Sequence, residues 1–309
     1  MQLSQEKAAT KDSVATPLTF KKLHPHFVAE ASTVNLCQVD DKARLQQIRT
    51  ALDEHAVVVF RNQPFREDEQ LKFAQRLDSN VNFNSTTAVF LGKGRLGYDG
   101  MIDVSNVTDK GEVWGANDRK RMSRMSNRLW HTDASFQDPA GRYSMLWAKT
   151  VPPVSAPTEF ADMRAAYDAL DDEMKARLKG MHTHHSSIRN KEILGFDLSL
   201  DQKDMEKLHA ADHPLVRTIP RSNRRSLYIA THATHILELP VPEGRMVLHE
   251  LMEHATQRQF VFRHEWQQGD LVIWDNRATM HRRPPFDDLK HPRELVRVTT
   301  LDYPEPSHA

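Results

Sequence analysis

The sequence has very little cysteine. Cys37 is the single cysteine among 309 residues, so an internal disulfide framework and a thiolate-rich zinc site are both excluded. This cysteine usage fits a reducing compartment, and we expect a cytoplasmic protein. Residues 1–14 are polar and charged and contain no apolar segment that resembles a signal peptide.

An excess of charge of one sign is also missing. Lys and Arg together number 42, as do Asp and Glu, so no global field attracts nucleic acid or an anionic membrane. Long hydrophobic runs are absent as well, since runs such as residues 56–60 are far too short to cross a bilayer. We therefore expect a small-molecule partner, and any selectivity for an anion must come from a local site.

The chain also lacks internal repeats, low-complexity tracts and an obvious interdomain linker. Its 39% hydrophobic and 27% charged residues are typical of a globular protein with a substantial core. Residues 1–16 carry polar side chains without periodicity and are expected to form a disordered tail. We predict a single domain over residues 17–309.

Short strands dominate the expected secondary structure. Apolar residues at helical spacing predict helices over 40–56, 66–77, 162–170, 171–181 and 243–257, with Asp162 as a helix cap. Apolar and β-branched runs predict strands at 56–60, 101–104, 142–151, 158–160, 215–219, 226–230, 260–266, 270–274 and 294–301. This pattern favours a mainly β fold, a sandwich or jelly roll flanked by helices.

The segment from Leu129 to Phe136 carries the clearest chemical signal. His131 and Asp133 are two residues apart, so on an extended segment both side chains leave the same face. His281 would complete two histidines and one carboxylate, a set that leaves three metal positions open and favours non-haem Fe(II) oxygen chemistry. A His-x-Asp pair also occurs by chance, and a structural hydrogen-bonded pair is the alternative.

A second signal lies on the strand predicted at residues 294–301. Alternation places Arg293 and Arg297 on one face and Val296 and Val298 on the other. If the valines face the core, the arginines are simply solvated. The other interpretation is that the arginines bind carboxylates, one belonging to a co-substrate and the other to a substrate.

Several long motifs in order resemble the taurine dioxygenase family of Fe(II)/2-oxoglutarate-dependent oxygenases, and most closely its 2,4-dichlorophenoxyacetate dioxygenase branch. The likeness runs from about Leu23 to Asp302 and is carried by residues 129–136, 142–146, 158–170, 240–246, 253–258, 269–277, 281–282 and 293–297. It implies a double-stranded β-helix, which is a jelly roll. It also implies Fe(II) as cofactor, with 2-oxoglutarate and O2 as co-substrates.

The resemblance implies a role for seven residues. The expected iron ligands are His131, Asp133 and His281. The distal carboxylate of 2-oxoglutarate is expected at Thr158 and Arg293, and the substrate at Arg297 and Asn127. The implied reaction is hydroxylation of a small anionic substrate, plausibly an aryloxyalkanoate whose ether is cleaved to a phenol and a 2-oxo acid, with succinate and CO2 as co-products.

Three alternatives stay open at this point. A guanidinium accepts sulfonate as readily as carboxylate, so a sulfonate dioxygenase is the first. The second is a zinc hydrolase that uses the same triad, and the third is a jelly roll without catalysis.

The stretch from Asn82 to Gly97 departs from the branch. The equivalent stretch of the branch carries a lysine, and this chain offers only Lys93 or Arg95 in its place. A homo-oligomer is expected because relatives assemble.

Other histidines form two clusters along the chain. The first holds His182, His184 and His185, and the second holds His232 and His235. No carboxylate or cysteine at zinc spacing accompanies them, so surface or supporting roles are favoured over a second metal. His185 resembles a histidine of the branch and could line the pocket.

Overall fold

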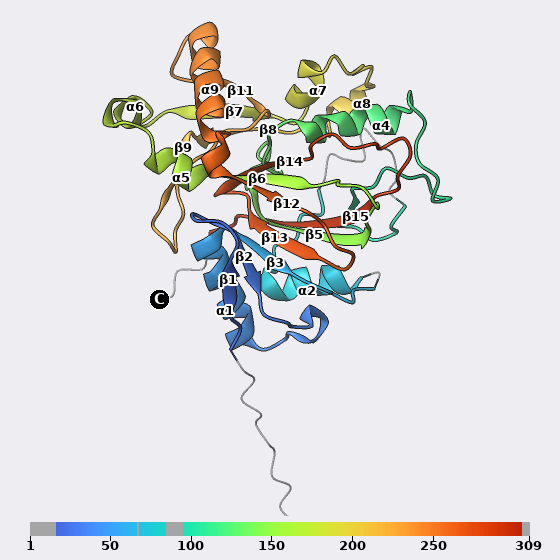
Figure 1. Cartoon of the computed structure of the whole chain (residues 1–309). Helices are drawn as coiled ribbons and strands as arrows, with labels where there is room; N and C mark the ends of the chain where they lie inside the picture. The colour runs from blue at the N-terminus through green and yellow to red at the C-terminus, as the bar shows by residue number, and fades with distance from the viewer. Residues whose placement is uncertain (1–16, 67, 85–94, 305–309) are drawn as a thin grey trace, which may run out of the picture.

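The structure is a computed structural model that describes residues 17–66, 68–84 and 95–304 (Figure 1). The tail predicted at residues 1–16 and most of the stretch from Asn82 to Gly97 lie outside the described residues. Two β-sheets form the centre of the molecule. The larger sheet has the strand order β1-β2-β3-β13-β5-β15-β4, and the smaller has the order β12-β6-β14.

Every strand pair in these two sheets is antiparallel except β2 with β3. The large sheet contains β1 (Phe20–Lys22), β2 (Ala29–Ala31), β3 (Val57–Phe60), β13 (Leu271–Asp275), β5 (Gly141–Thr150), β15 (Glu294–Leu301) and β4 (Met101–Asp103). The small sheet contains β12 (Val261–His264), β6 (Thr158–Asp162) and β14 (Thr279–Arg282). This mainly β architecture confirms the predicted jelly roll.

The large sheet is covered on both faces. Because successive side chains of a strand point to opposite faces, Val57 and Val59 pack in the core cluster that also holds Phe160 of the small sheet. Val58 and Phe60 pack instead with the helices α1 (Lys42–His55) and α2 (Glu69–Leu77). These helices cover the outer face of the large sheet at the bottom of Figure 1. Unbroken apolar strands are what a sheet buried on both faces requires.

Local signals explain where the predicted helices begin and end. Asp41 caps α1 by accepting a hydrogen bond from the Arg44 N–H at 2.7 Å. The helix stops because Ala56 adopts a left-handed conformation with φ of 58°. Ala56 is therefore the end of the helix, and the strand predicted from it begins at Val57. The predicted cap Asp162 is confirmed, since its carboxylate accepts from the Arg164 N–H at 3.0 Å.

A second helical layer covers the small sheet. It holds α5 (Met163–Asp168) and α9 (Val241–Ala255), and one apolar cluster joins both to the small-sheet residues Ala161 and Met280. This part of the molecule also contains the helix α6 (Asp172–Arg177) and two small sheets. One is a hairpin of β9 (Val216–Thr218) and β10 (Arg225–Leu227), and the other consists of β11 (Ala233–Ile236), β7 (His182–Ser186) and β8 (Ala210–Pro214).

Short helices surround one end of the jelly roll. They are α4 (Arg119–Arg124), the 3-10 turn η2 (Met125–Arg128), α7 (Arg189–Ile193) and α8 (Gln202–Met205), with further 3-10 turns η1 (Leu36–Gln38) and η3 (Arg258–Phe260) elsewhere. Sequence periodicity did not predict β1, β2, β7, β8, β11, β14, α4, α7 or α8. Each has at most six residues, too few for a periodic pattern. Among the described residues, none of the helices has the length and apolar character needed to span a bilayer.

Candidate metal centre and cavity

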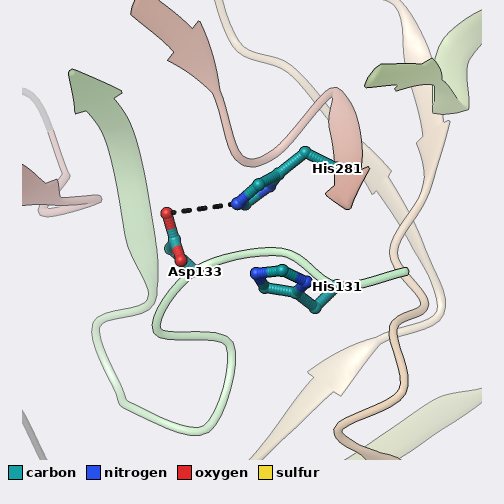
Figure 2. Close-up of side chains that lie close together, drawn as sticks. All are labelled: His131, Asp133 and His281. Atoms are coloured by element: carbon teal, nitrogen blue, oxygen red, sulfur yellow. Dashed lines mark ion pairs between the residues drawn. The ribbon is translucent and has the colours of Figure 1, made fainter. Parts of the chain in front are cut away.

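The structure brings His131, Asp133 and His281 together between the two sheets (Figure 2). One potential ligand atom from each residue lies within 4.8 Å of the others, and all three side chains are buried. The two histidines form an isolated antiparallel bridge. The His131 N–H donates to the His281 carbonyl at 3.0 Å, and the His281 N–H donates back at 2.8 Å. The main chain thus aligns two ligands that are 150 positions apart.

The two imidazoles are held differently. Nδ1 of His131 lies 2.8 Å from the Leu129 carbonyl, which fixes the proton on Nδ1 and leaves Nε2 as a lone pair. The His281 ring packs against Trp274 and Phe160, with centroid distances of 4.6 Å and 6.1 Å. Its buried Nδ1 has no hydrogen-bond partner among the described residues. Burial lowers the pKa of both histidines, so both are neutral, as metal ligands must be.

Asp133 is held in its ionised form. Burial raises the pKa of this carboxyl, but Arg297 and the two histidines outweigh burial and bring the pKa to about 2. Nη1 of Arg297 donates to Oδ1. Ser144 Oγ donates to Oδ2 at 2.7 Å, and Oδ2 lies 3.7 Å from Nε2 of His281. Two neutral imidazoles and one carboxylate fit a divalent cation of the Fe(II) type.

Asn276 supports this arrangement from behind. Its Oδ1 accepts hydrogen bonds from the Asp133 N–H at 3.1 Å, from Trp274 Nε1 at 2.9 Å and from Thr132 Oγ1 at 3.2 Å. Its Nδ2 donates to Ser144 Oγ at 3.0 Å. Asn276 thereby connects the segment that carries Asp133 to the strands β13 and β5. Sequence analysis did not single out this residue, because an asparagine between Asp275 and Arg277 has no recognisable pattern.

Gly141 allows the Asp133 segment to lie against β5. A Cβ added at this position would approach the Asp133 carbonyl oxygen to 2.3 Å, far inside normal contact. Only glycine fits without moving the main chain of the candidate ligand.

Thr158 and Arg293 form a separate polar site. Nη2 of Arg293 lies 3.4 Å from Thr158 Oγ1, and Trp266 Nε1 donates to the same oxygen at 3.0 Å. Burial and, to a smaller extent, the nearby charge of Arg283 lower the pKa of Arg293 to about 9. Arg293 makes no ion pair with the described part of the chain. A buried guanidinium beside a hydroxyl is a site for an anion.

Arg293, which directly precedes β15, and Arg297 within β15 are not simply solvated. Val296 and Val298 face the core, but the opposite side of the strand is covered as well, because Leu295 and Thr299 are also buried. Arg293 is 3% exposed, and Arg297 reaches Asp133. The valines do face the core, as the solvated interpretation requires, yet neither arginine is simply solvated, so that interpretation is wrong.

His131 and Asp133 line a cavity of about 110 Å³. Residues from several separate parts of the chain form its wall. The lining includes Asn127, Arg124, His131, Asp133, Lys191, His232 and Arg297. Asn127 and Arg124 also line a smaller neighbouring cavity that contains Arg293. Five of the seven residues expected from the sequence thus line one or both of these cavities. The other two are next to them, since His281 lies beside His131 and Asp133 and Thr158 contacts Arg293.

The other histidines separate into distinct environments. His182 and His184 lie on β7 and contact the carboxylates of Glu238 and Asp212 at 2.9 Å and 2.6 Å. His232 lines the cavity, 6.1 Å from the His131 ring. His185 is buried behind the described residues that line the cavity, so the expectation that it could line the pocket is not met.

The candidate replacements for the lysine of the branch are placed as follows. Lys93 lies outside the described residues. Arg95 is held by Asp103 and Glu294, each at 2.6 Å, and is not among the residues that line the cavity. Lys191 does line it, and no sequence pattern had distinguished this lysine from the others.

Comparison with known proteins gives consistent matches over most of the chain. The family model described as taurine catabolism dioxygenase TauD, TfdA family matches residues 19–299. The 2,4-dichlorophenoxyacetate dioxygenase of Cupriavidus pinatubonensis, dependent on alpha-ketoglutarate, is 42% identical over 91% of this chain and 96% of its own. The (S)-phenoxypropionate/alpha-ketoglutarate-dioxygenase of Sphingobium herbicidovorans is 31% identical over 84% and 87% of the two chains.

A solved structure is also similar to this chain over most of its length. The crystal structure of AAD-2 in complex with Mn(II) and N-oxalylglycine superposes with a TM-score of 0.87 and 37% identity, covering 93% of this chain and 98% of that one. A sulfate ester dioxygenase of Pseudomonas putida, also dependent on alpha-ketoglutarate, is less similar, at 26% identity over 88% and 85% of the two chains.

Proposed function

The chain belongs to the taurine catabolism dioxygenase TauD, TfdA family, and on this premise we propose that it hydroxylates an aryloxyalkanoate and so cleaves its ether bond. It is an Fe(II)- and 2-oxoglutarate-dependent dioxygenase that uses O2 and releases succinate and CO2. One observation carries the proposal: two neutral imidazoles and one carboxylate meet at a cavity whose wall is rich in cationic side chains.

His131, Asp133 and His281 would hold the Fe(II). The bound metal, with 2-oxoglutarate and O2, supplies an oxidant able to replace a C–H bond by C–OH. The chain's own contribution is positioning. Thr158 and Arg293 bind the distal carboxylate of 2-oxoglutarate, for which the buried guanidinium and its neighbouring hydroxyl are suited. N-oxalylglycine, found in the related crystal structure, has the same two carboxylates.

Arg297 holds the acid group of the primary substrate, and Asn127 lines the substrate side of the metal. This places the carbon between the acid group and the ether oxygen nearest the metal triad. Hydroxylation at that carbon gives a hemiacetal. The hemiacetal hydroxyl loses its proton, the carbonyl forms, and the bond to the aryl oxygen breaks. The aryl oxygen takes a proton, so the products are a phenol and a 2-oxo acid.

The alternatives lose support for different reasons. A sulfonate would also suit Arg297, but the more similar relatives act on aryloxy acids and the sulfate ester enzyme is more distant. A zinc hydrolase would need no 2-oxoglutarate and no O2, and family membership does not support it. A jelly roll without catalysis would not require all three potential metal ligands, which this chain has in His131, Asp133 and His281.

The test has two stages. Anaerobic addition of Fe(II) and then 2-oxoglutarate to the purified protein should give the weak visible charge-transfer band of a metal-bound 2-oxo acid. His131→Ala should abolish the band, whereas His249→Ala on the exposed side of α9 should keep it. Absence of the band in the folded wild-type protein would overturn the cofactor assignment.

With O2 admitted, 2,4-dichlorophenoxyacetate should yield succinate and 2,4-dichlorophenol in equal amounts. Taurine and an alkyl sulfate serve as competitors. If more sulfite or sulfate than phenol is released, the substrate assignment changes from an aryloxyalkanoate to a sulfur-containing compound. The cofactor assignment would stand in that case.

We also propose that residues 17–309 act as one catalytic domain and that the protein is a cytoplasmic homo-oligomer. A symmetric dimer is the commonest assembly of soluble homo-oligomers. Light scattering coupled to size-exclusion chromatography would measure the assembly, and a monomeric mass at micromolar concentration would contradict it.

A further inference from the structure

The sheet of β11, β7 and β8, beside α9 in the upper part of Figure 1, carries three histidines on its outward face. Thr183 and His185 of β7 are buried, and because side chains alternate along a strand, His182 and His184 point away from the core. His235 of β11 is paired with His184 in the sheet register. Paired residues of antiparallel strands project from the same side. We call the surface formed by His182, His184 and His235 the histidine face.

Two carboxylates orient the histidines of β7. Nδ1 of His184 lies 2.6 Å from Oδ1 of Asp212, the residue opposite it on β8. Nδ1 of His182 lies 2.9 Å from Oε1 of Glu238, which follows β11. A carboxylate at Nδ1 keeps the proton there and leaves a lone pair on Nε2, the arrangement found around histidines that bind metals. The two pairs are 28 and 56 positions apart in the chain, so spacing along the sequence could not reveal them.

The third imidazole is oriented in the same way by a hydroxyl group. Thr234 Oγ1 donates its proton to the His184 carbonyl at 3.2 Å, so it accepts a hydrogen bond from Nδ1 of His235, which is 2.7 Å away. The rings of His235 and His184 are 5.6 Å apart between centroids. Within the described part of the chain, Nε2 of none of the three histidines makes a hydrogen bond. All three Nε2 lone pairs are therefore available to a ligand.

The donor set indicates which class of ion would bind. Imidazole nitrogens suit Zn(II), Ni(II) and Cu(II), whereas Mg(II) and Ca(II) prefer oxygen ligands. Three imidazoles and one water complete the tetrahedral coordination that Zn(II) prefers. Behind the ligands, the carboxylates of Asp212 and Glu238 supply two negative charges, which match the charge of a divalent ion. An uncharged or anionic ligand would gain nothing from them.

The three imidazoles must move slightly to share one ion. Among the described residues, only the catalytic triad has three potential ligand atoms that all lie within 4.8 Å of one another. The side chains of His182 and His184 are 44% and 34% exposed, so they can rotate without disturbing the core. Directly paired Cβ atoms of neighbouring strands are about 4.5–5.5 Å apart. Side-chain rotation alone can therefore bring the Nε2 atoms together.

We propose that the histidine face is a second cation site of the chain, for an ion of the Zn(II) type, separate from the Fe(II) triad. It would bind the ion through Nε2 of His182, His184 and His235. The inference does not depend on the proposed function, because none of these residues lines the catalytic cavity.

An ion bound here would stabilise one part of the cavity wall. β7 leads directly into Ser187, and β11 begins directly after His232, and both of these residues line the cavity. The Ser186 N–H donates to the His232 carbonyl at 2.9 Å, so the two segments are already joined at this end of the sheet. Because the ion would bind histidines from both strands, it would join the same two strands at a second point.

Zinc stoichiometry tests the proposal. Calorimetric titration of the metal-free full-length protein with Zn(II) should show one ion at the triad and one at the histidine face. His184→Ala and His131→Ala should each bind one ion fewer than the wild type, and the double variant should bind none. The matched control is His249→Ala, which removes an exposed histidine 3.8 Å from the carboxylate of Glu253 on α9. This control should bind as much zinc as the wild type.

Further variants test the geometry. His182→Asn and His235→Asn should each weaken zinc binding to the His131→Ala protein. Asp212→Asn, which removes the carboxylate behind His184, should weaken it about 10–100-fold. Zn(II) should raise the unfolding temperature of His131→Ala but leave that of the double variant unchanged, and Mg(II) should change neither.

A zinc count that His184→Ala does not lower would overturn the inference, as would equal effects of His184→Ala and His249→Ala. If His131→Ala does not fold, His281→Ala removes a triad ligand in its place. The charge-transfer band of the Fe(II)–2-oxoglutarate complex should survive His184→Ala in either case. Failure of this inference is therefore distinguishable from failure of the proposed function.

Discussion

Replacement of Asn276 by alanine tests whether the metal triad is organised by the chain itself. The Asn276 side chain is buried, and its loss would leave two buried donors without an acceptor, the Asp133 N–H and Trp274 Nε1. Thr132 Oγ1 would keep the main-chain carbonyl of residue 276, which it already contacts at 2.8 Å. Each orphaned donor costs about 1–3 kcal/mol, so we expect Asn276→Ala to lower the free energy of unfolding by about 2–6 kcal/mol.

The same change should weaken metal binding. Asp133 would lose the contact that fixes its main chain, and Ser144 would lose the Asn276 Nδ2 donor that orients it toward Asp133. Loss of such supporting contacts typically reduces metal affinity about 10–100-fold. Urea unfolding of the metal-free protein measures the first effect, and a Mn(II) titration followed by electron paramagnetic resonance measures the second.

The control is Gln259→Ala, whose side chain is exposed on η3 and whose removal should change the free energy of unfolding by less than about 0.5 kcal/mol. The reasoning is refuted if Asn276→Ala unfolds within about 1 kcal/mol of the wild type and binds Mn(II) with unchanged affinity. In that case water replaces the amide, and the triad does not depend on it.

Three further outcomes are expected. Arg293→Ala should raise the KM for 2-oxoglutarate about 10–100-fold, and Arg297→Ala should raise the KM for the primary substrate by a similar factor. Equal effects of one variant on both KM values would contradict the two assignments. Because burial lowers the pKa of His131, its imidazole is neutral above about pH 6.5. The Mn(II) affinity measured by titration should therefore be nearly constant from about pH 6.5 to about pH 8 and fall in more acidic solution. A rise in affinity on acidification would contradict this. Gly141→Ala would bring a methyl group to 2.3 Å from the Asp133 carbonyl oxygen, so it should weaken Mn(II) binding by at least tenfold, while Gly115→Ala, where a Cβ meets nothing within 4 Å, should not.

The sequence was most informative where the residues of one feature lie together in a single short motif. The His131–Asp133 spacing indicated a shared face, and the many short apolar strands indicated a β-sandwich or jelly roll. His281 could be offered as the third ligand from its residue type, and the resemblance then linked the two distant motifs. The backbone bridge that joins His281 to His131 could not be predicted, since β14 has four residues and no periodicity of its own.

The remaining parts of the site depend on contacts between distant segments. Asn276 has ordinary sequence neighbours, and its role arises from Asp133, which is more than 100 positions away. Alternation along β15 also misled in part, because it assumes that one face of a strand is solvated. Here helices cover one face and the small sheet covers the other, so local pattern alone could not place the arginines.

The backbone bridge between His131 and His281 has a consequence for metal supply in the cell. Hydrogen bonds of the main chain align the two imidazoles, so the ligand set exists before any ion arrives and contains no thiolate. Such a site does not choose its ion by softness, and the intrinsic order of affinity places Cu(II) and Zn(II) above Fe(II). Correct loading must therefore follow from which ion is available when the protein folds. We expect a trace of zinc to inhibit the enzyme by mismetallation, reversibly with a chelator and excess Fe(II).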